Sequence, residues 1–220
     1  MDGRRTRWRR LLRADKLDHI APASQMALQE YGVRSIIDLR YSREVLESPD
    51  VIAQSDQFTY VHMPLYELAG IDMLPVIPDD AGELYRLIID HRQKPITRII
   101  EMLVPSRPQP TLIHCTAGKD RTGIIIALVL GAVGVPAETI VDEYMLSKER
   151  LAPLLDLLRD QAKENGWDAE WYDRLLACQS EFMRDMLDHI DRQYGGIVSY
   201  LQQAGVTSLQ IERLRSWLLE

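Results

Sequence analysis

A short segment in the middle of the chain carries residue types that could together bind and cleave a phosphate ester. It reads His114-Cys115-Thr116-Ala117-Gly118-Lys119-Asp120-Arg121-Thr122-Gly123. Five residues separate Cys115 from Arg121, so the backbone can curl into a ring with its N–H groups inward. Gly118 tolerates the left-handed conformation that such a ring requires. With a helix N-terminus directly behind it, the ring predicts a binding site for an oxyanion of phosphate size.

The same surroundings would activate the sulfur of Cys115. A thiol at a helix N-terminus beside an arginine ionises more readily than a free thiol, so we expect Cys115 to be a nucleophilic thiolate at neutral pH. Arg121 supplies a planar pair of donors that matches two oxygens of a phosphoryl group. The hydroxyl of Thr122 could donate to the sulfur and stabilise it as the leaving group when a phosphocysteine is hydrolysed.

Other readings of this segment have to be weighed against phosphate ester hydrolysis. A lone buried cysteine is most often a small apolar core residue, so the interpretation rests on the whole segment. A catalytically silent phosphate- or phosphoinositide-binding module would keep the ring, but Cys115, Asp120 and Arg121 are all intact. A sulfur-transfer enzyme would also use a loop cysteine, but its persulfide chemistry does not require an arginine at this spacing.

The elements that must position this segment can be read from hydrophobic patterning. Short apolar runs predict buried strands at Ser35–Leu39, Tyr60–Met63 and Thr111–His114. Amphipathic stretches between them predict helices at Pro22–Tyr31, Glu83–Gln93 and Ile96–Val104. Strands that alternate with helices indicate an α/β fold with a central, mostly parallel sheet flanked by helices.

After Gly123 the pattern becomes helical almost throughout, which predicts a helix-rich C-terminal half of about five helices. The expected breaks lie at Gly134-Val135-Pro136, Pro153, Asn165-Gly166, Gly195-Gly196 and Gly205. Gly195-Gly196 is a candidate hinge.

The length of 220 residues fits one sizeable domain, which we expect to span residues 1–220. The net charge of −7 argues against unspecific binding of nucleic acid.

The cysteines, Cys115 and Cys178, indicate reduced thiols, and Cys178 lies in an apolar helical pattern typical of a core position. A secretory signal is not recognisable and no apolar stretch is long enough to span a bilayer, so a cytoplasmic location is the default. Secretion by a signal-less route stays open.

Residues 1–16 form either a basic N-terminal arm or the first strand. Their basic side chains are Arg4, Arg5, Arg7, Arg9, Arg10, Arg13 and Lys16. Such an arm is commonly solvated, but it could also attract anionic lipid, which leaves peripheral membrane contact open.

The central segment resembles the phosphate-binding loop of cysteine-dependent protein tyrosine phosphatases, specifically the bacterial atypical group, whose loop is His-Cys-x-x-Gly-Lys-Asp-Arg-Thr-Gly. The segment from Gly32 to Glu44 resembles this family's Asp-Leu-Arg strand and its Ser-x-x-Glu continuation, and Tyr194 to Leu214 resembles its C-terminal helices. The resemblance implies a protein tyrosine phosphatase-like fold and a phosphatase of dual or triple specificity. It further implies a phosphorylated protein or a phosphoinositide as substrate, and no metal or cofactor.

Carried over position by position, the resemblance also implies roles for the loop residues. The catalytic residues would be Cys115, Asp120 and Arg121. The substrate-binding residues would be Thr116, Ala117, Gly118, Lys119, Asp120, Arg121 and Thr122. Lys119 would add a second cation at the rim of the pocket, which favours a substrate with more than one phosphate.

The general acid is open among several carboxyl groups. Asp120 is preferred because the loop fixes its distance to the phosphate and because the family resemblance points to it. The alternatives are Glu67, Asp72, Asp79 and Asp80, in or near the loop after the second predicted strand. Some members of the family carry an insertion there that builds a helical lid. Here only residues 64–110 intervene, so we expect part of that lid to be missing and the pocket to be more open.

Supporting roles are expected for residues beside the loop. Asp38 and Arg40 at the end of the first predicted strand could pair with each other or brace the loop. His114 is expected to bond to nearby backbone rather than to transfer protons. The remaining histidines show no spacing typical of metal ligands.

Overall fold

The computed structural model of the protein describes residues 3–68, 74–104 and 108–220. Its sheet consists of β1 (Leu11–Ala14), β2 (Ser35–Asp38), β3 (Thr59–His62) and β4 (Thr111–His114), in the order β1-β4-β2-β3 with all neighbours parallel. The last residues of β1 and β2 both pair with His114, the last residue of β4. The carboxyl ends of three strands therefore meet at one edge, where open α/β sheets place their ligand sites.

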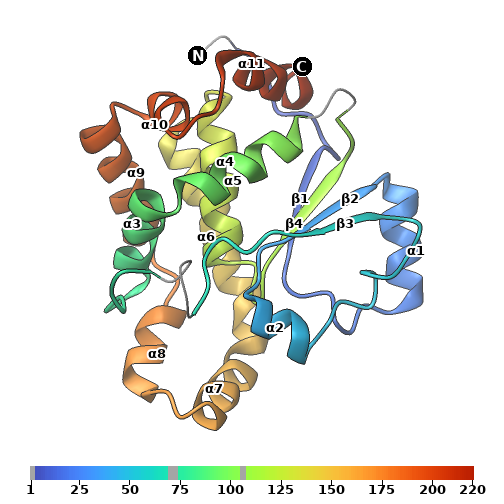
Figure 1. Ribbon diagram of the computed structural model, residues 1–220, viewed down its shortest axis with the longest axis vertical. Helices are drawn as coiled ribbons and strands as arrows, with labels where there is room; N and C mark the ends of the chain where they lie inside the picture. Colours follow the sequence, from blue (N-terminus) through green and yellow to red (C-terminus); the bar gives the residue numbers. More distant parts are fainter. Residues whose placement is uncertain (1–2, 69–73, 105–107) are drawn as a thin grey trace.

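Helices cover both faces of this sheet (Figure 1). The helices before β4 are α1 (Pro22–Tyr31), α2 (Ser42–Glu47), α3 (Ala81–His91) and α4 (Gln93–Leu103). Those after β4 are α5 (Asp120–Ala132), α6 (Ala137–Leu151), α7 (Leu155–Glu164), α8 (Ala169–Leu176), α9 (Ser180–Tyr194), α10 (Ile197–Gln203) and α11 (Ser208–Leu218), with a short 3₁₀ turn, η1 (Ala152–Leu154), before α7.

The alternation of strand side chains divides the core in two. Ile36 and Leu112 point to the face covered by α1 and belong to a small apolar cluster there. Ile37 and Ile113 point to the opposite face and join the large cluster to which α3, α4 and the C-terminal helices contribute. Helix α5, which follows the candidate loop, is apolar on nearly all sides and lies in this larger core. The loop is therefore held between a buried strand and a buried helix.

The predicted α/β class and parallel sheet are confirmed. The Thr111–His114 strand and the Pro22–Tyr31 helix have the predicted bounds, and the other predicted strands and helices of the first half are shifted by one to three residues at an end. Every predicted break in the C-terminal half separates two helices, but a further break at residues 177–179 gives more helices than expected. The N-terminal segment is not a free arm, because Leu11–Ala14 is an edge strand of the sheet.

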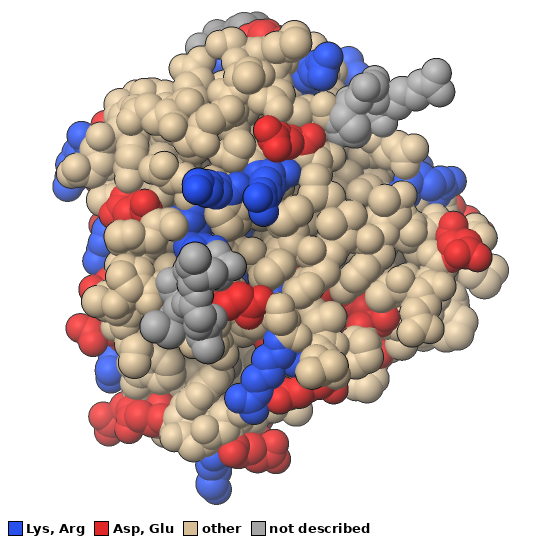
Figure 2. Space-filling model, viewed as in Figure 1, with Lys and Arg blue, Asp and Glu red and all other residues tan. Residues whose placement is uncertain are grey.

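No helix in the described parts of the chain is long and apolar enough to cross a bilayer. On the face shown in Figure 2, Lys and Arg side chains lie among Asp and Glu side chains, and a few of the Lys and Arg side chains adjoin one another above the centre of the view.

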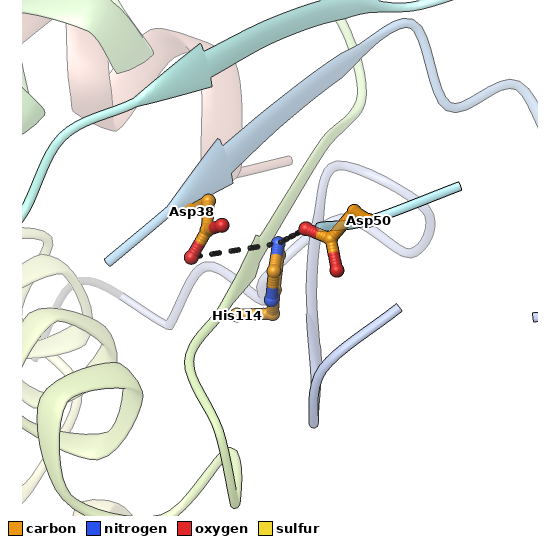
Figure 3. Close-up of side chains that lie close together, drawn as sticks. All are labelled: Asp38, Asp50 and His114. Atoms are coloured by element: carbon orange, nitrogen blue, oxygen red, sulfur yellow. Dashed lines mark ion pairs between the residues drawn. The ribbon is translucent and has the colours of Figure 1, made fainter. Parts of the chain in front are cut away.

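A buried ion-pair network joins the carboxyl ends of β2 and β4. The Arg40 guanidinium donates to Asp38 at 2.8 Å and lies 2.9 Å from Asp50. The Tyr60 hydroxyl donates to Asp38 at 2.6 Å. From the other side, His114 Nε2 approaches Asp50 to 3.1 Å and Asp38 to 3.9 Å (Figure 3). The predicted pairing of Asp38 with Arg40 is thus confirmed, and Asp50 extends it to the residue before Cys115.

This network makes folding sensitive to acid. Burial alone would raise the pKa of Asp38, but the hydrogen bond from Arg40 and the charge of His114 outweigh it and lower the pKa to about 2. Because the pKa is lower in the folded than in the unfolded chain, the ionised carboxylate favours folding above the ordinary aspartate pKa of 3.8. That contribution is lost as the pH falls from there to about 2.

Asp38→Asn should lower the free energy of unfolding at pH 7 by about 3–5 kcal/mol, because it leaves part of the buried Arg40 charge uncompensated. The loss should shrink as the pH falls toward 2, where the wild-type carboxylate is itself protonated. Chemical denaturation at several pH values measures both effects. Glu138→Gln removes a carboxylate from an exposed ion pair with Arg184 and is the matched control; equal effects of the two substitutions would contradict the network's role.

Candidate active site

The segment between β4 and α5 forms the predicted ring. The strand ends at His114, the helix starts at Asp120, and Cys115 follows the strand directly with a side chain that is 2% exposed. Gly118 adopts the left-handed conformation at φ +63°, and a Cβ there would lie 2.6 Å from the carbonyl oxygen of Ala14. The expectation for Gly118 is therefore confirmed twice, since both the backbone angle and the close approach of β1 require glycine.

The carbonyl groups of this loop are bound from outside. The backbone N–H of Lys16 donates to Thr116 O at 3.2 Å, and the Arg13 guanidinium donates to Gly118 O and to Lys119 O. Arg13 is itself held by Glu143 at 2.7 Å. The amides of residues 116–119 donate to no group in the described parts of the chain. The loop thus has engaged carbonyls and free N–H groups, which is the state an anion site requires.

Arg121, the second residue of α5, is buried at the cavity and is held in place by three neighbours. Its guanidinium forms a forked pair with the Glu44 carboxylate at 2.5 and 3.0 Å. It also donates to the Thr116 hydroxyl at 3.2 Å, and its carbon lies 4.4 Å from the centre of the Tyr41 ring. These contacts fix the plane of the guanidinium beside Cys115.

Glu44 was not singled out as a site residue by sequence reasoning. Burial alone would raise its pKa, but the charge of Arg121 and hydrogen bonds from Arg121 and Thr116 outweigh it and lower the pKa. A local signal was present in Tyr41-Ser42-Arg43-Glu44, because Glu44 is the third residue of α2 and accepts from the backbone N–H of Tyr41 at 2.7 Å, as a capping glutamate does. That cap turns the carboxylate toward Arg121.

A cavity of about 670 Å³ opens above Cys115. Apolar and aromatic side chains form most of its wall. They are Tyr41, Tyr66, Leu68, Leu74, Pro75, Val76, Ile77, Pro78, Leu84, Leu158, Trp167, Trp171, Tyr172, Leu175 and Leu176. Among the described lining residues, Arg121 is the one Lys or Arg, whereas the carboxylates are Glu44, Glu67, Asp120 and Asp168. The cavity therefore has a polar floor, formed by the loop and Arg121, and a largely apolar wall.

The carboxyl groups weighed as general acids fall in different places. Asp120 and Glu67 line the cavity, whereas Asp79 and Asp80 do not. Asp80 instead caps α3 by accepting from Glu83 N at 2.8 Å. Asp72 lies outside the described residues. Of the original alternatives, Glu67 therefore shares the cavity with Asp120.

The two candidate acids that line the cavity, Asp120 and Glu67, have different partners. Asp120 Oδ1 accepts from the Tyr85 hydroxyl at 2.6 Å. Glu67 is bound by Ser42, whose backbone N–H and hydroxyl both donate to it. Burial, and then the charge of Asp120, raises the pKa of Tyr85 well above its ordinary value, so Tyr85 stays a neutral donor. Asp120 is thus held at the start of α5, within the phosphate loop itself.

Lys119 is the clearest correction to the sequence-based expectation. Its side chain is completely buried rather than at the rim of the cavity, which it does not line. The ammonium donates to Leu175 O at 2.6 Å and to Ala177 O at 2.8 Å, at the end of α8. The reason is that Lys119 precedes α5 on the side of the loop that packs against the C-terminal helices. The ammonium therefore points away from the cavity.

The other loop residues fall partly where expected. Thr116 and Ala117 line the cavity. Thr122 is fully buried, but its hydroxyl has no hydrogen-bond partner among the described residues, so the expected bond to the sulfur is not formed. His114 Nδ1 lies 3.4 Å from Cys115 O, in line with its expected contact to nearby backbone. Cys178 is half-buried and packs against the main core.

One group of side chains has the composition of a metal site. Asp38, Asp50 and His114 bring ligand atoms within 4.8 Å of one another (Figure 3). Both carboxylates are already bound by Arg40, and Asp38 also by Tyr60. A guanidinium in that position satisfies the negative charge that a cation would need, so the group is interpreted as an ion-pair network.

Part of the cavity wall comes from helices that follow the loop, whereas the sequence-based expectation rested only on the segment between the second predicted strand and the loop. Helices α7 and α8, which follow the loop in sequence, supply Leu158, Trp171, Tyr172 and Leu175 to the wall. Figure 1 shows these two helices at the end of the molecule opposite the two termini. The expectation of a more open pocket therefore overlooked a wall built by the C-terminal half.

Several known proteins with similar sequences are named as phosphatases. A tyrosine-protein phosphatase of Nostoc commune is 32% identical over 212 residues, which cover 93% of this chain and 72% of that protein. The triple specificity protein phosphatase PtpB of Mycobacterium tuberculosis is 28% identical over 260 residues, 96% of this chain and 91% of that protein. A solved structure, the core catalytic domain of the PP-IP phosphatase SIW14 from S. cerevisiae with citrate, has a TM-score of 0.40 and 19% identity over 71% of this chain and 88% of that chain.

The family assignment rests on the match over the full sequence. The profile of the tyrosine phosphatase family matches residues 1–220, which include the loop, the strand before it and the helices that close the cavity. The resemblance drawn from the loop motif is thereby confirmed, and the chain belongs to the tyrosine phosphatase family.

Proposed function

We propose that this protein is a cysteine-based phosphatase that hydrolyses phosphate monoesters of aromatic alcohols, phosphotyrosine foremost, without a metal ion. One observation carries the proposal: Cys115 lies at the floor of a cavity beside free loop amides and a fixed Arg121. A nucleophile, an oxyanion site and a cation therefore converge on one position.

In the first step, the Cys115 thiolate attacks phosphorus in line with the ester oxygen. The sulfur–phosphorus bond forms while the phosphorus–oxygen bond to the leaving group breaks, and a carboxylic acid gives that oxygen a proton. The loop amides and Arg121 bind the equatorial oxygens as charge develops on them. Asp120 is the proposed donor because it lines the cavity at the start of α5, next to Arg121 in the chain.

In the second step, water attacks the phosphocysteine. The carboxylate left by the first step accepts a proton from that water, the phosphorus–sulfur bond breaks, and phosphate leaves with the thiolate restored. The same amides and Arg121 hold the equatorial oxygens again. Residues 115–122 thus carry the chemistry of both steps.

The charges in the cavity bear on the class of substrate. One guanidinium lies among several carboxylates in the described lining, and Lys119 points away from it. A second phosphate on the substrate would have to approach these carboxylates without a cation to receive it, which is unfavourable. The apolar wall instead suits an aromatic ring. These features favour a singly phosphorylated aromatic residue over a phosphoinositide with several phosphates.

Cys115→Ser should reduce the turnover of para-nitrophenyl phosphate, measured with a chelator present, by at least about a thousandfold. The serine hydroxyl is a far weaker nucleophile, but the amides and Arg121 remain, so binding of inorganic phosphate measured by calorimetry should persist. Cys178→Ser is the matched control and should keep its turnover. Unchanged activity of Cys115→Ser would remove the nucleophile assignment, and a wild-type protein that binds phosphate without turnover would be a silent module.

Asp120→Asn should slow phenyl phosphate by about 10²–10⁴-fold and para-nitrophenyl phosphate much less, because a good leaving group needs little help from an acid. Steady-state rates on both esters test this. Asp79→Asn, which alters a carboxylate outside the cavity, should match wild type. Equal slowing of both esters by Asp120→Asn, together with ester-dependent slowing by Glu67→Gln, would transfer the acid role to Glu67.

A phosphotyrosyl peptide should have a kcat/KM at least about tenfold above that of any phosphoinositide bearing two or more ring phosphates, because each added phosphate meets the lining carboxylates. Phosphate release from both substrates, in the same detergent, gives the ratio. Glu67→Gln removes one negative charge from the wall and should bring the two kcat/KM values closer together. Faster turnover of the phosphoinositide by the wild-type protein would rule out the proposed preference.

A further inference from the structure

The ammonium group of Lys119 is completely enclosed, and it has two hydrogen-bond acceptors and one ion-pair partner. It donates to Leu175 O and Ala177 O at 2.6 and 2.8 Å, and it lies 3.2 Å from Asp120 Oδ1. Two carbonyl oxygens and one carboxylate thus surround the charge. Enclosing a charge costs several kcal/mol unless it is fully bonded, so such an arrangement holds its parts strongly in place.

The two carbonyl groups belong to the end of α8. The last carbonyl groups of a helix have no partner within the helix, and they carry the negative end of its dipole. The chain after α8 continues as Ala177-Cys178-Gln179, without the glycine that commonly ends a helix. Lys119 therefore supplies from the phosphate loop the contacts that a local cap supplies elsewhere.

Helix α8 is the part of the cavity wall that this contact positions. Trp171, Tyr172, Leu175 and Leu176 from α8 all line the cavity. Helix α8 is also tied to the segment before α3, because Trp171 Nε1 donates to Pro78 O at 2.8 Å. The end of α8 is thus joined to the loop through Lys119, and its first turns are joined to the opposite wall.

We propose that Lys119 is a positioning residue that binds the end of α8 and so holds the apolar wall at a fixed distance from the phosphate site. It acts on the substrate's aromatic group through α8 and not on the phosphate. The inference rests on the proposed function, since it assigns the binding of the leaving group in that same site. It replaces the expected role of this lysine as a second phosphate ligand.

The structural part of the proposal is tested by hydrogen exchange of Lys119→Met, which keeps the length of the side chain and removes the charge. Amides of α8 should exchange at least about fivefold faster, because two carbonyl groups lose their partner. Those of α11, far along the chain in the main core, should not change. Lys148→Met, at an exposed lysine of α6, is the control. Unchanged exchange in α8, or an equal rise in α11, would overturn the proposal whether or not the protein is a phosphatase.

The functional part is tested by comparing ligands that use the wall with one that does not. In Lys119→Met, KM for 1-naphthyl phosphate should rise at least about fivefold, while the competitive inhibition constant of inorganic phosphate should move less than about twofold. A parallel rise of both constants would mean that Lys119 acts on the phosphate itself. An unchanged KM for the naphthyl ester would mean that the position of α8 does not matter for the substrate.

Discussion

The contact between Arg13 and the carbonyl oxygens of Gly118 and Lys119 fixes the direction of the phosphate loop. A peptide group has its carbonyl and its N–H on opposite sides, so binding the carbonyls from outside turns the amides inward. Arg13 is available there because β1 runs parallel to β4 as its edge neighbour. Glu143 of α6 in turn holds the guanidinium. The anion site thus depends on the first strand and on a helix far along the chain.

The charged side chains around Cys115 form two separate groups, one that stabilises the fold and one that lines the cavity. Asp38, Arg40, Asp50 and His114 are buried beneath the sheet edge and bind one another. Their function is to hold the strand ends in register. Arg121 and its partner Glu44 lie on the cavity side, where the fork of the guanidinium is fixed before any anion arrives. Such preorganisation is what makes electrostatic stabilisation of a transition state effective.

The sequence was informative wherever local chemistry decides the structure. Short apolar runs predicted β2, β3 and β4, and the requirement for a left-handed residue predicted the conformation of Gly118. The spacing of Cys115 and Arg121 predicted a ring with free amides. The bounds of helices were less certain, because a helix end depends on caps that a neighbouring element can supply.

Two features could not be read from the sequence because they depend on contacts between distant residues. Glu44 reaches Arg121 across 77 positions, so its capping position at the start of α2 is visible in the local sequence but its ion pair is not. The cavity wall formed by α7 and α8 likewise comes from a part of the chain beyond the loop. A motif therefore identifies the reacting groups more readily than the groups that surround the substrate.

The wrong expectation for Lys119 and the missed break after α8 have the same physical origin. A lysine in a phosphate-binding loop is most simply expected to face the phosphate, and an apolar helical pattern without glycine or proline is most simply expected to continue. Both simple expectations fail because the ammonium binds Leu175 O and Ala177 O. The helix can end there because its carbonyl groups are satisfied by another part of the chain. The loop loses a surface cation for the same reason, and the side of the cavity near α8 is formed by the apolar and aromatic side chains of that helix.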